Sequence, residues 1–177
     1  VSAIYLSFFS IYTPTLEGTW LGLENYRTLL TKGEFWSSLR TNLIWTAGTL
    51  LLQIVFGVGM ALVLHQNIWF RSLARSLILF PYFISTVVAV LVWKWLFNDL
   101  YGILNYLMIS AGIIDWPVDF LGSMPNAMIS VILVGAWKYF PFVVIAVLAR
   151  LQSIPNHLYE SAKIDGAGPV ARFFDIT

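Results

Sequence analysis

The sequence predicts an all-α, polytopic membrane protein, a bundle of transmembrane helices with about three complete spans. Hydrophobic residues make up 59% of the 177 residues and charged residues only 11%, whereas an ordinary soluble domain is about 45–50% apolar and about 25% charged. One small core cannot hide that much apolar surface from water. In addition, three windows reach the roughly 20 apolar residues that a membrane helix needs. None of them alternates in the way that a membrane barrel requires.

The composition also excludes several kinds of site. The absence of cysteine removes disulfides, thiolate catalysis and cysteine zinc sites. A net charge of +1 provides no basic field for nucleic acid. The two histidines, His65 and His157, lack the spacing of a helical zinc motif, and no serine nucleophile elbow with its partners occurs. We therefore predict no catalytic residue and no metal site.

The first predicted unit, residues 1–38, holds the end of a transmembrane helix and an external loop. Ser2–Tyr12 is apolar and aromatic, and it lacks the basic leader of a signal peptide. We interpret it as the last part of a helix that begins earlier, and the sequence as a fragment. Thr13–Arg40 is expected to be irregular because prolines and glycines interrupt it.

The second predicted unit, residues 39–177, contains the three spans, at about 41–64, 73–97 and 126–149. In the first span, the small pair Gly57 and Ala61 permits close contact with another helix. Pro81 in the second span is interpreted as a proline that a membrane helix tolerates.

A glycine- and proline-rich loop, residues 98–125, separates the second and third spans. Within it, Ile103–Ala111 predicts a short amphipathic helix. That helix lies either on the membrane surface or within a packed extramembrane loop.

The distribution of basic residues predicts the orientation, because cytoplasmic loops carry an excess of lysine and arginine. The loop 98–125 contains three aspartates and no basic residue, so it is predicted to lie outside. The turn at 65–75 and the segment 150–177 are predicted to be cytoplasmic because they hold Arg71, Arg75, Arg150, Lys163 and Arg172. With three spans the segment 13–40 is also outside, although its own three basic residues oppose this.

The segment after the third span predicts two short helices joined by a bend. Pro155 suits a first helical turn, since its missing N–H would have no partner there. Gly166 ends that helix cheaply because glycine adopts a positive φ without cost, and Pro169 can start a second helix over 170–176. Small residues and one acid on this element suit insertion into a groove of another protein. The alternative is an ordinary amphipathic surface helix.

These residues carry a resemblance to a known family. Glu160-Ser161-Ala162 is followed after three residues by Gly166 and after nine more by Ile176. This spacing resembles the Glu-Ala-Ala motif of the inner-membrane permeases of ABC importers. Ser161 replaces the usual alanine, and the chain ends before the final Leu-Pro of the motif. The longer pattern Ile-Pro-x-x-Leu-Tyr-Glu-x-Ala-x-Ile-Asp-Gly-Ala and the segment Gly22–Tyr26 are similar to the carbohydrate branch of this family.

The resemblance implies a type-1 permease fold whose transmembrane domain, residues 39–177, is incomplete at its C-terminus. It implies import of a sugar or related polyol through the cytoplasmic membrane of a bacterium or archaeon. The implied partners are two ABC ATPase subunits, a second permease (the same or a different chain) and an extracytoplasmic substrate-binding protein. ATP and Mg would bind the ATPases, and this chain has no phosphate-binding Gly-x-x-x-x-Gly-Lys-Ser/Thr loop. The residues implied to dock on the ATPase are Glu160, Ser161, Ala162, Asp165, Gly166 and Ala167.

One charge falls inside the third span. Lys138 would cost at least roughly 2.5–3.5 kcal/mol at the centre of a membrane helix, so it should face protein or water. With Trp137 and Tyr139 it can line a substrate path, since aromatic faces suit a sugar ring. The alternative is a lysine that snorkels or pairs structurally, with the aromatic rings packed against lipid.

Three rival functions make different demands on the sequence. An ion-coupled secondary transporter would need carboxylates inside the spans, and the three windows contain none. A membrane-embedded enzyme would need an acid pair or nucleophile there. A non-transporting structural subunit would have no reason for a bent docking element of small residues.

Overall fold

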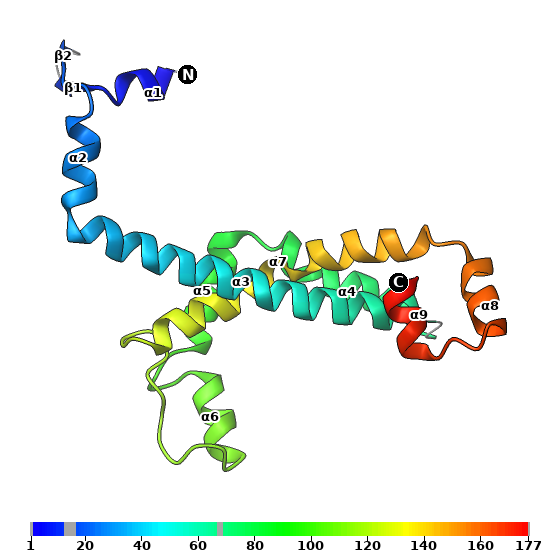
Figure 1. Ribbon diagram of the computed structural model, residues 1–177. Coiled ribbons are helices and arrows are strands. Elements are labelled where there is room, and N and C mark those ends of the chain that lie inside the picture. Colours follow the sequence, from blue (N-terminus) through cyan, green and yellow to red (C-terminus); the bar gives the residue numbers. More distant parts are fainter. Residues whose placement is uncertain (1, 13–16, 67–68, 177) are drawn as a thin grey trace. The chain divides into compact units, whose positions relative to one another are not determined.

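The computed structural model describes residues 2–12, 17–66 and 69–176, and its predominantly helical secondary structure confirms the predicted class (Figure 1). The chain forms two compact units, Val1–Ile44 and Trp45–Thr177. Two helices in the described part are long and apolar enough to cross a membrane, and a bent helix pair makes a third candidate if it forms one span.

The first unit contains α1 (Ser2–Leu6), β1 (Phe9–Tyr12), β2 (Glu17–Trp20), α2 (Glu24–Thr31) and the start of α3. The strands pair antiparallel. The predicted helix over Ser2–Tyr12 is therefore wrong beyond Leu6, and the segment predicted to be irregular contains β2, α2 and the start of α3.

Aromatic contacts across this small hairpin explain the early end of α1. The rings of Phe9 and Trp20 meet edge to face at 5.0 Å, and Phe8 stacks on Trp20 at 5.6 Å. The side-chain amide of Asn25 donates to the carbonyl oxygens of Ser7 and Phe9, at 2.8 and 3.1 Å. A continuous helix would lose these contacts, which lie far apart in the sequence.

The two long helices of the fold are α3 (Gly33–His65) and α7 (Asn126–Gln152). Helix α3 begins eight residues before its predicted span and α7 ends three residues after its own, since polar ends can extend beyond the hydrocarbon. Gly57 lies so close to α7 that a Cβ there would sit 2.5 Å from the Cβ of Val143. The predicted close contact through Gly57 and Ala61 is confirmed.

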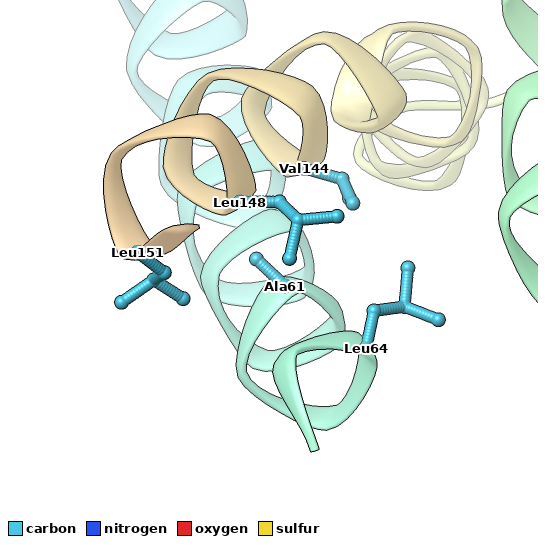
Figure 2. Close-up of a cluster of buried hydrophobic side chains, with 5 residues drawn as sticks. All are labelled: Ala61, Leu64, Val144, Leu148 and Leu151. Atoms are coloured by element: carbon cyan, nitrogen blue, oxygen red, sulfur yellow. The ribbon is translucent and has the colours of Figure 1, made fainter. Parts of the chain in front are cut away.

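A small apolar core holds the predicted cytoplasmic ends of α3 and α7 together. Figure 2 shows Ala61 and Leu64 of α3 facing Val144, Leu148 and Leu151 of α7. All five are buried. The α7 residues recur at helical spacing, so one stripe of that helix meets α3.

The second predicted span is broken. One continuous helix was predicted over 73–97, but the structure has α4 (Arg71–Phe83) and α5 (Thr86–Leu96), bent by 95° at the break. Helix α4 continues past Pro81, so the proline is not itself the break. Ser85 occupies the N-cap position of α5, and serine is a preferred residue there.

The loop between α5 and α7 contains the predicted short helix, α6 (Ile103–Ser110), and it is organised by the buried amide of Asn105. This amide accepts from the backbone N–H of Val118 at 2.9 Å and donates to the Val118 carbonyl at 3.0 Å. Longer contacts reach the carbonyls of Asn98 and Asp99. One side chain therefore joins both ends of the loop.

Replacing Asn105 with leucine should release this loop. A buried N–H or carbonyl left without a partner costs about 1–3 kcal/mol, so we expect a loss of about 2 kcal/mol in the local opening free energy. Hydrogen exchange of the α6 amides in the full-length protein should then be roughly 30-fold faster. The exposed Ser110 on the same helix supplies the control, Ser110→Ala. Unchanged exchange in Asn105→Leu would contradict this role.

Candidate functional site

Two short helices follow α7, namely α8 (Asn156–Ile164) and α9 (Pro169–Asp175) (Figure 1). Their bounds agree closely with the two short helices that the sequence predicts. Gly166 has a φ of +78°. The N–H of Ala167 donates to the Ala162 carbonyl at 2.9 Å, and the N–H of Gly166 donates to the Lys163 carbonyl at 3.3 Å. This pair of bonds is a Schellman cap, so the bend has a defined geometry.

The six residues predicted to dock on the ATPase lie together on this capped helix end. Ala162 and Ala167 are half-buried and occupy the two positions that commonly touch in such a cap. Glu160, Ser161, Asp165 and Gly166 are exposed. Within the described residues, neither carboxylate forms an ion pair. The element therefore presents two unpaired acids beside a small-residue surface.

Large apolar side chains are also exposed on α8 and α9. Ile164 is 87% exposed and Phe174 is 78% exposed, and Leu158, Val170 and Phe173 are exposed as well. In water such a group of side chains usually marks a contact surface. Together with the unpaired acids, it gives the element the mixed character of a protein interface.

The second feature of the site is an open cavity of about 400 Å³ among α3, α5 and α7. Its wall is mostly apolar and aromatic, with the indoles of Trp45 and Trp93 and the ring of Phe97. Aromatic walls with few polar groups are typical of small-molecule sites.

The predicted substrate-path residues are only partly brought together here. Lys138 and Tyr139 line the cavity. Trp137 instead packs edge to face on Trp93, with ring centroids 5.3 Å apart, and thus supports the wall from behind. The Lys138 ammonium group lies 5.6 Å from the centre of the Tyr139 ring.

The α5 side of the cavity was not predicted from the sequence. Ala89, Trp93 and Phe97 all line it and recur every four residues, so a helical repeat would have placed them on one face. The repeat does not stand out in the sequence because almost every residue of this span is apolar, so no polar face contrasts with it.

Comparison with protein families decides what kind of molecule carries these two features. Residues 53–177 match the family described as "Binding-protein-dependent transport system inner membrane component". The chain belongs to this permease family. The match covers α5, α7, the second part of α3 and the whole α8–α9 element. The family predicted from the Glu160–Ile176 motif is therefore confirmed, and with it a multi-pass inner-membrane protein that acts in transport.

Three curated relatives illustrate the similarity of this chain to transport permeases, and two of them are named for a sugar or sugar derivative. It is 33% identical over 161 residues to the trehalose/maltose transport system permease protein MalF of Thermococcus litoralis, covering 91% of this chain and 54% of the relative. It is 34% identical over 179 residues to the inner membrane ABC transporter permease protein YcjO of Escherichia coli, covering 100% and 61%. It is 33% identical over 178 residues to the sulfoquinovosyl glycerol transport system permease protein SmoG of Agrobacterium fabrum, covering 98% and 56%.

Two solved structures share the fold of the permease. A bacterial ABC transporter involved in the import of the acidic polysaccharide alginate matches with a TM-score of 0.79 at 24% identity, covering 98% of this chain and 62% of that chain. A bacterial alginate ABC transporter in complex with an alginate pentasaccharide-bound periplasmic protein matches with a TM-score of 0.76 at 25% identity, covering 85% and 52%. The chain thus spans between about half and three fifths of the length of these proteins.

Proposed function

We propose that this chain is the translocating part of a permease in an ATP-driven importer of a sugar or related polyol. The observation that supports this most directly is the capped α8 end, where Gly166 holds a fixed bend and two exposed acids form no ion pair with any described residue. A rigid helix end of this kind suits insertion into a groove of an ATPase subunit. The division into an external segment, residues 1–38, and a transmembrane domain, residues 39–177, is part of the same proposal.

In this mechanism, the ATPases bind ATP and Mg, and their closure moves the docked element. Only three residues separate the end of α7 from the start of α8, so a movement of α8 is transmitted almost directly to α7. The helices then switch between two packed arrangements, one open inward and one open outward. An extracytoplasmic binding protein supplies the substrate, and a second permease, identical or different, completes the pathway.

The cavity beside α7 is the proposed substrate path. The Tyr139 side chain is 42% exposed and stands in the same wall as Trp45 and Trp93, which suits stacking on the apolar face of a sugar ring. Trp137 braces Trp93, and Lys138 also contributes to the wall. Homology to importers of several different carbohydrates supports the substrate class and not a particular sugar.

Two glycines allow a matched test of the docking bend. Gly166 has a positive φ, whereas Gly168 does not, and a Cβ on either would meet open space. Gly166→Ala should cost about 1–2 kcal/mol because an L-residue resists the left-handed conformation, whereas Gly168→Ala should cost less, since Gly168 has a φ of −69° that any residue adopts. Gly166→Asn should be milder than Gly166→Ala, since asparagine tolerates this conformation.

The measurement is uptake of a panel of radiolabelled sugars by proteoliposomes that hold the full-length permease, its ATPase and its binding protein. We expect uptake that requires ATP, an approximately 5- to 30-fold loss in Gly166→Ala, and near-parental uptake in Gly168→Ala. Equal uptake in all variants, or uptake driven by an ion gradient without ATPase, would contradict the proposal. Transport of amino acids but of no sugar would support an ATP-driven importer and contradict the proposed substrate class.

A further inference from the structure

The break between α4 and α5 leaves backbone carbonyls without their helical donors. The last carbonyls of any helix have no partner within it, and inside a membrane each unsatisfied polar group costs several kcal/mol. Ile84 has an extended ψ of 136°, and its N–H donates to the Phe80 carbonyl at 3.3 Å. The carbonyls of Pro81 and Ile84 therefore need donors from elsewhere.

Lys138 supplies these donors from the middle of α7. Its ammonium nitrogen lies 2.6 Å from the Ile84 oxygen and 3.5 Å from the Pro81 oxygen. The residue is only 6% exposed. The described residues place no carboxylate in an ion pair with it, so its positive charge is balanced by carbonyl dipoles. The C-terminal end of a helix carries a partial negative charge that favours a cation.

We propose that Lys138 is a C-terminal cap for α4 within the bundle and that it holds the α4–α5 pair in its bent form. The role concerns the ammonium group and the backbone, and it differs from the substrate path, to which Lys138 contributes its stem. It also accounts for a charge near the middle of a long apolar helix. Without it, two carbonyls would stay unpaired unless α4 and α5 straightened or moved.

Lys94 offers a matched control. It lies in the last turn of α5 and lines the same cavity. It is exposed, and it donates no hydrogen bond to any residue in the described part of the chain. Lys94→Met therefore removes the same charge from the same cavity without touching the break, whereas Lys138→Met removes the cap.

The bend can be measured directly because these 177 residues contain no cysteine. Spin labels on Ser72→Cys of α4 and Val92→Cys of α5, both exposed, are placed in the full-length permease cleared of other cysteines. A straight helix would separate these positions by about 30 Å, and a 95° bend shortens this by roughly a third. Pulsed electron paramagnetic resonance then reports the distance distribution in proteoliposomes.

We expect the short distance in the parent protein, in Lys94→Met and in Lys138→Arg, which keeps a cationic donor. In Lys138→Met the distribution should shift by several ångströms or broaden. An unchanged distribution in a membrane-inserted Lys138→Met overturns the proposal. If that variant fails to insert, Lys138→Gln takes its place, because it keeps a donor but loses the charge and some reach. A distribution in Lys138→Gln identical to the parent's overturns the proposal equally, independently of any uptake result.

Discussion

Replacing Gly57 with leucine should prevent α3 and α7 from closing on each other and should remove most of the folded permease from the membrane. Even a single Cβ at this position would lie 2.5 Å from the Cβ of Val143 and 3.3 Å from the Phe140 carbonyl oxygen. Heavy atoms do not approach so closely, so the helix axes must separate. That separation would also open the neighbouring core around Ala61 and Val144.

The expected cost is large because both helices are long and stiff. Inserting an extra methylene group into a well-packed core typically costs about 1–3 kcal/mol of folding free energy. Leucine adds four heavy atoms at a position where the structure has no room for one. We expect at least about 3 kcal/mol of destabilisation. Gly59→Leu is the control, since Gly59 lies on the same helix and a Cβ there meets nothing within 4 Å.

The measurement is the amount of monodisperse full-length permease after detergent extraction, together with its thermal unfolding midpoint. Gly59→Leu should match the parent, and Gly57→Leu should be depleted several-fold. Adding Val143→Ala to Gly57→Leu should recover part of the loss because the two sites are in direct contact. Equal behaviour of the two leucine variants would show that α3 and α7 do not pack through Gly57.

The sequence predicted those parts of the fold that local rules determine. The long spans within α3 and α7 follow from apolar runs, and α6 follows from its short amphipathic repeat. The bend after α8 follows from Gly166, because few other residues accept its φ of +78°. Each of these features depends on residues that are neighbours in the chain.

The features that the sequence did not predict depend on contacts between distant residues. The hairpin that ends α1 is held by Trp20 and Asn25, which are 11 and 16 residues from Phe9, the residue that both of them contact. The α4–α5 break is joined to Lys138, which is 54 residues from Ile84. A hydropathy window cannot detect such pairs, although Ser85 at an N-cap position was a local signal that could have been used.

The cavity and the docking element are both connected to α7, so a movement of one can be transmitted to the other. Lys138 and Tyr139 lie in the cavity wall on α7, and α8 follows the end of that helix after three residues. Pro141 lies between the cavity and the docking element without interrupting the helix. A rigid α7 would therefore couple a movement of α8 to the cavity, and the sharpest test of that coupling is the docking acid itself.

Glu160→Ala should weaken ATPase binding without unfolding the permease. The carboxylate is exposed and forms no ion pair with the described residues, so its removal costs the isolated chain little. In the proposed complex it is buried against a basic residue of the ATPase. Removing one partner of such a pair costs about 2–5 kcal/mol, which corresponds to at least roughly 30-fold weaker binding. Asp115→Ala removes another exposed acid from the predicted outer loop and should leave binding unchanged.

Comparing Glu160→Gln with Glu160→Ala separates the contribution of the charge to ATPase binding from that of side-chain size. A defect in these variants also distinguishes a docked acid from one that is merely exposed at the surface. Glutamine keeps the size of the side chain and one acceptor oxygen, so a hydrogen-bonded contact would survive in part and an ion pair would not. We expect Glu160→Gln to lie between the parent and Glu160→Ala in co-purified ATPase, and its defect relative to the parent to shrink at high salt if the pair is partly hydrated. The extraction yield of the permease should stay constant throughout. Parental ATPase binding in both Glu160 variants would mean that the acid is solvated in the complex and that the small-residue bend alone carries the docking.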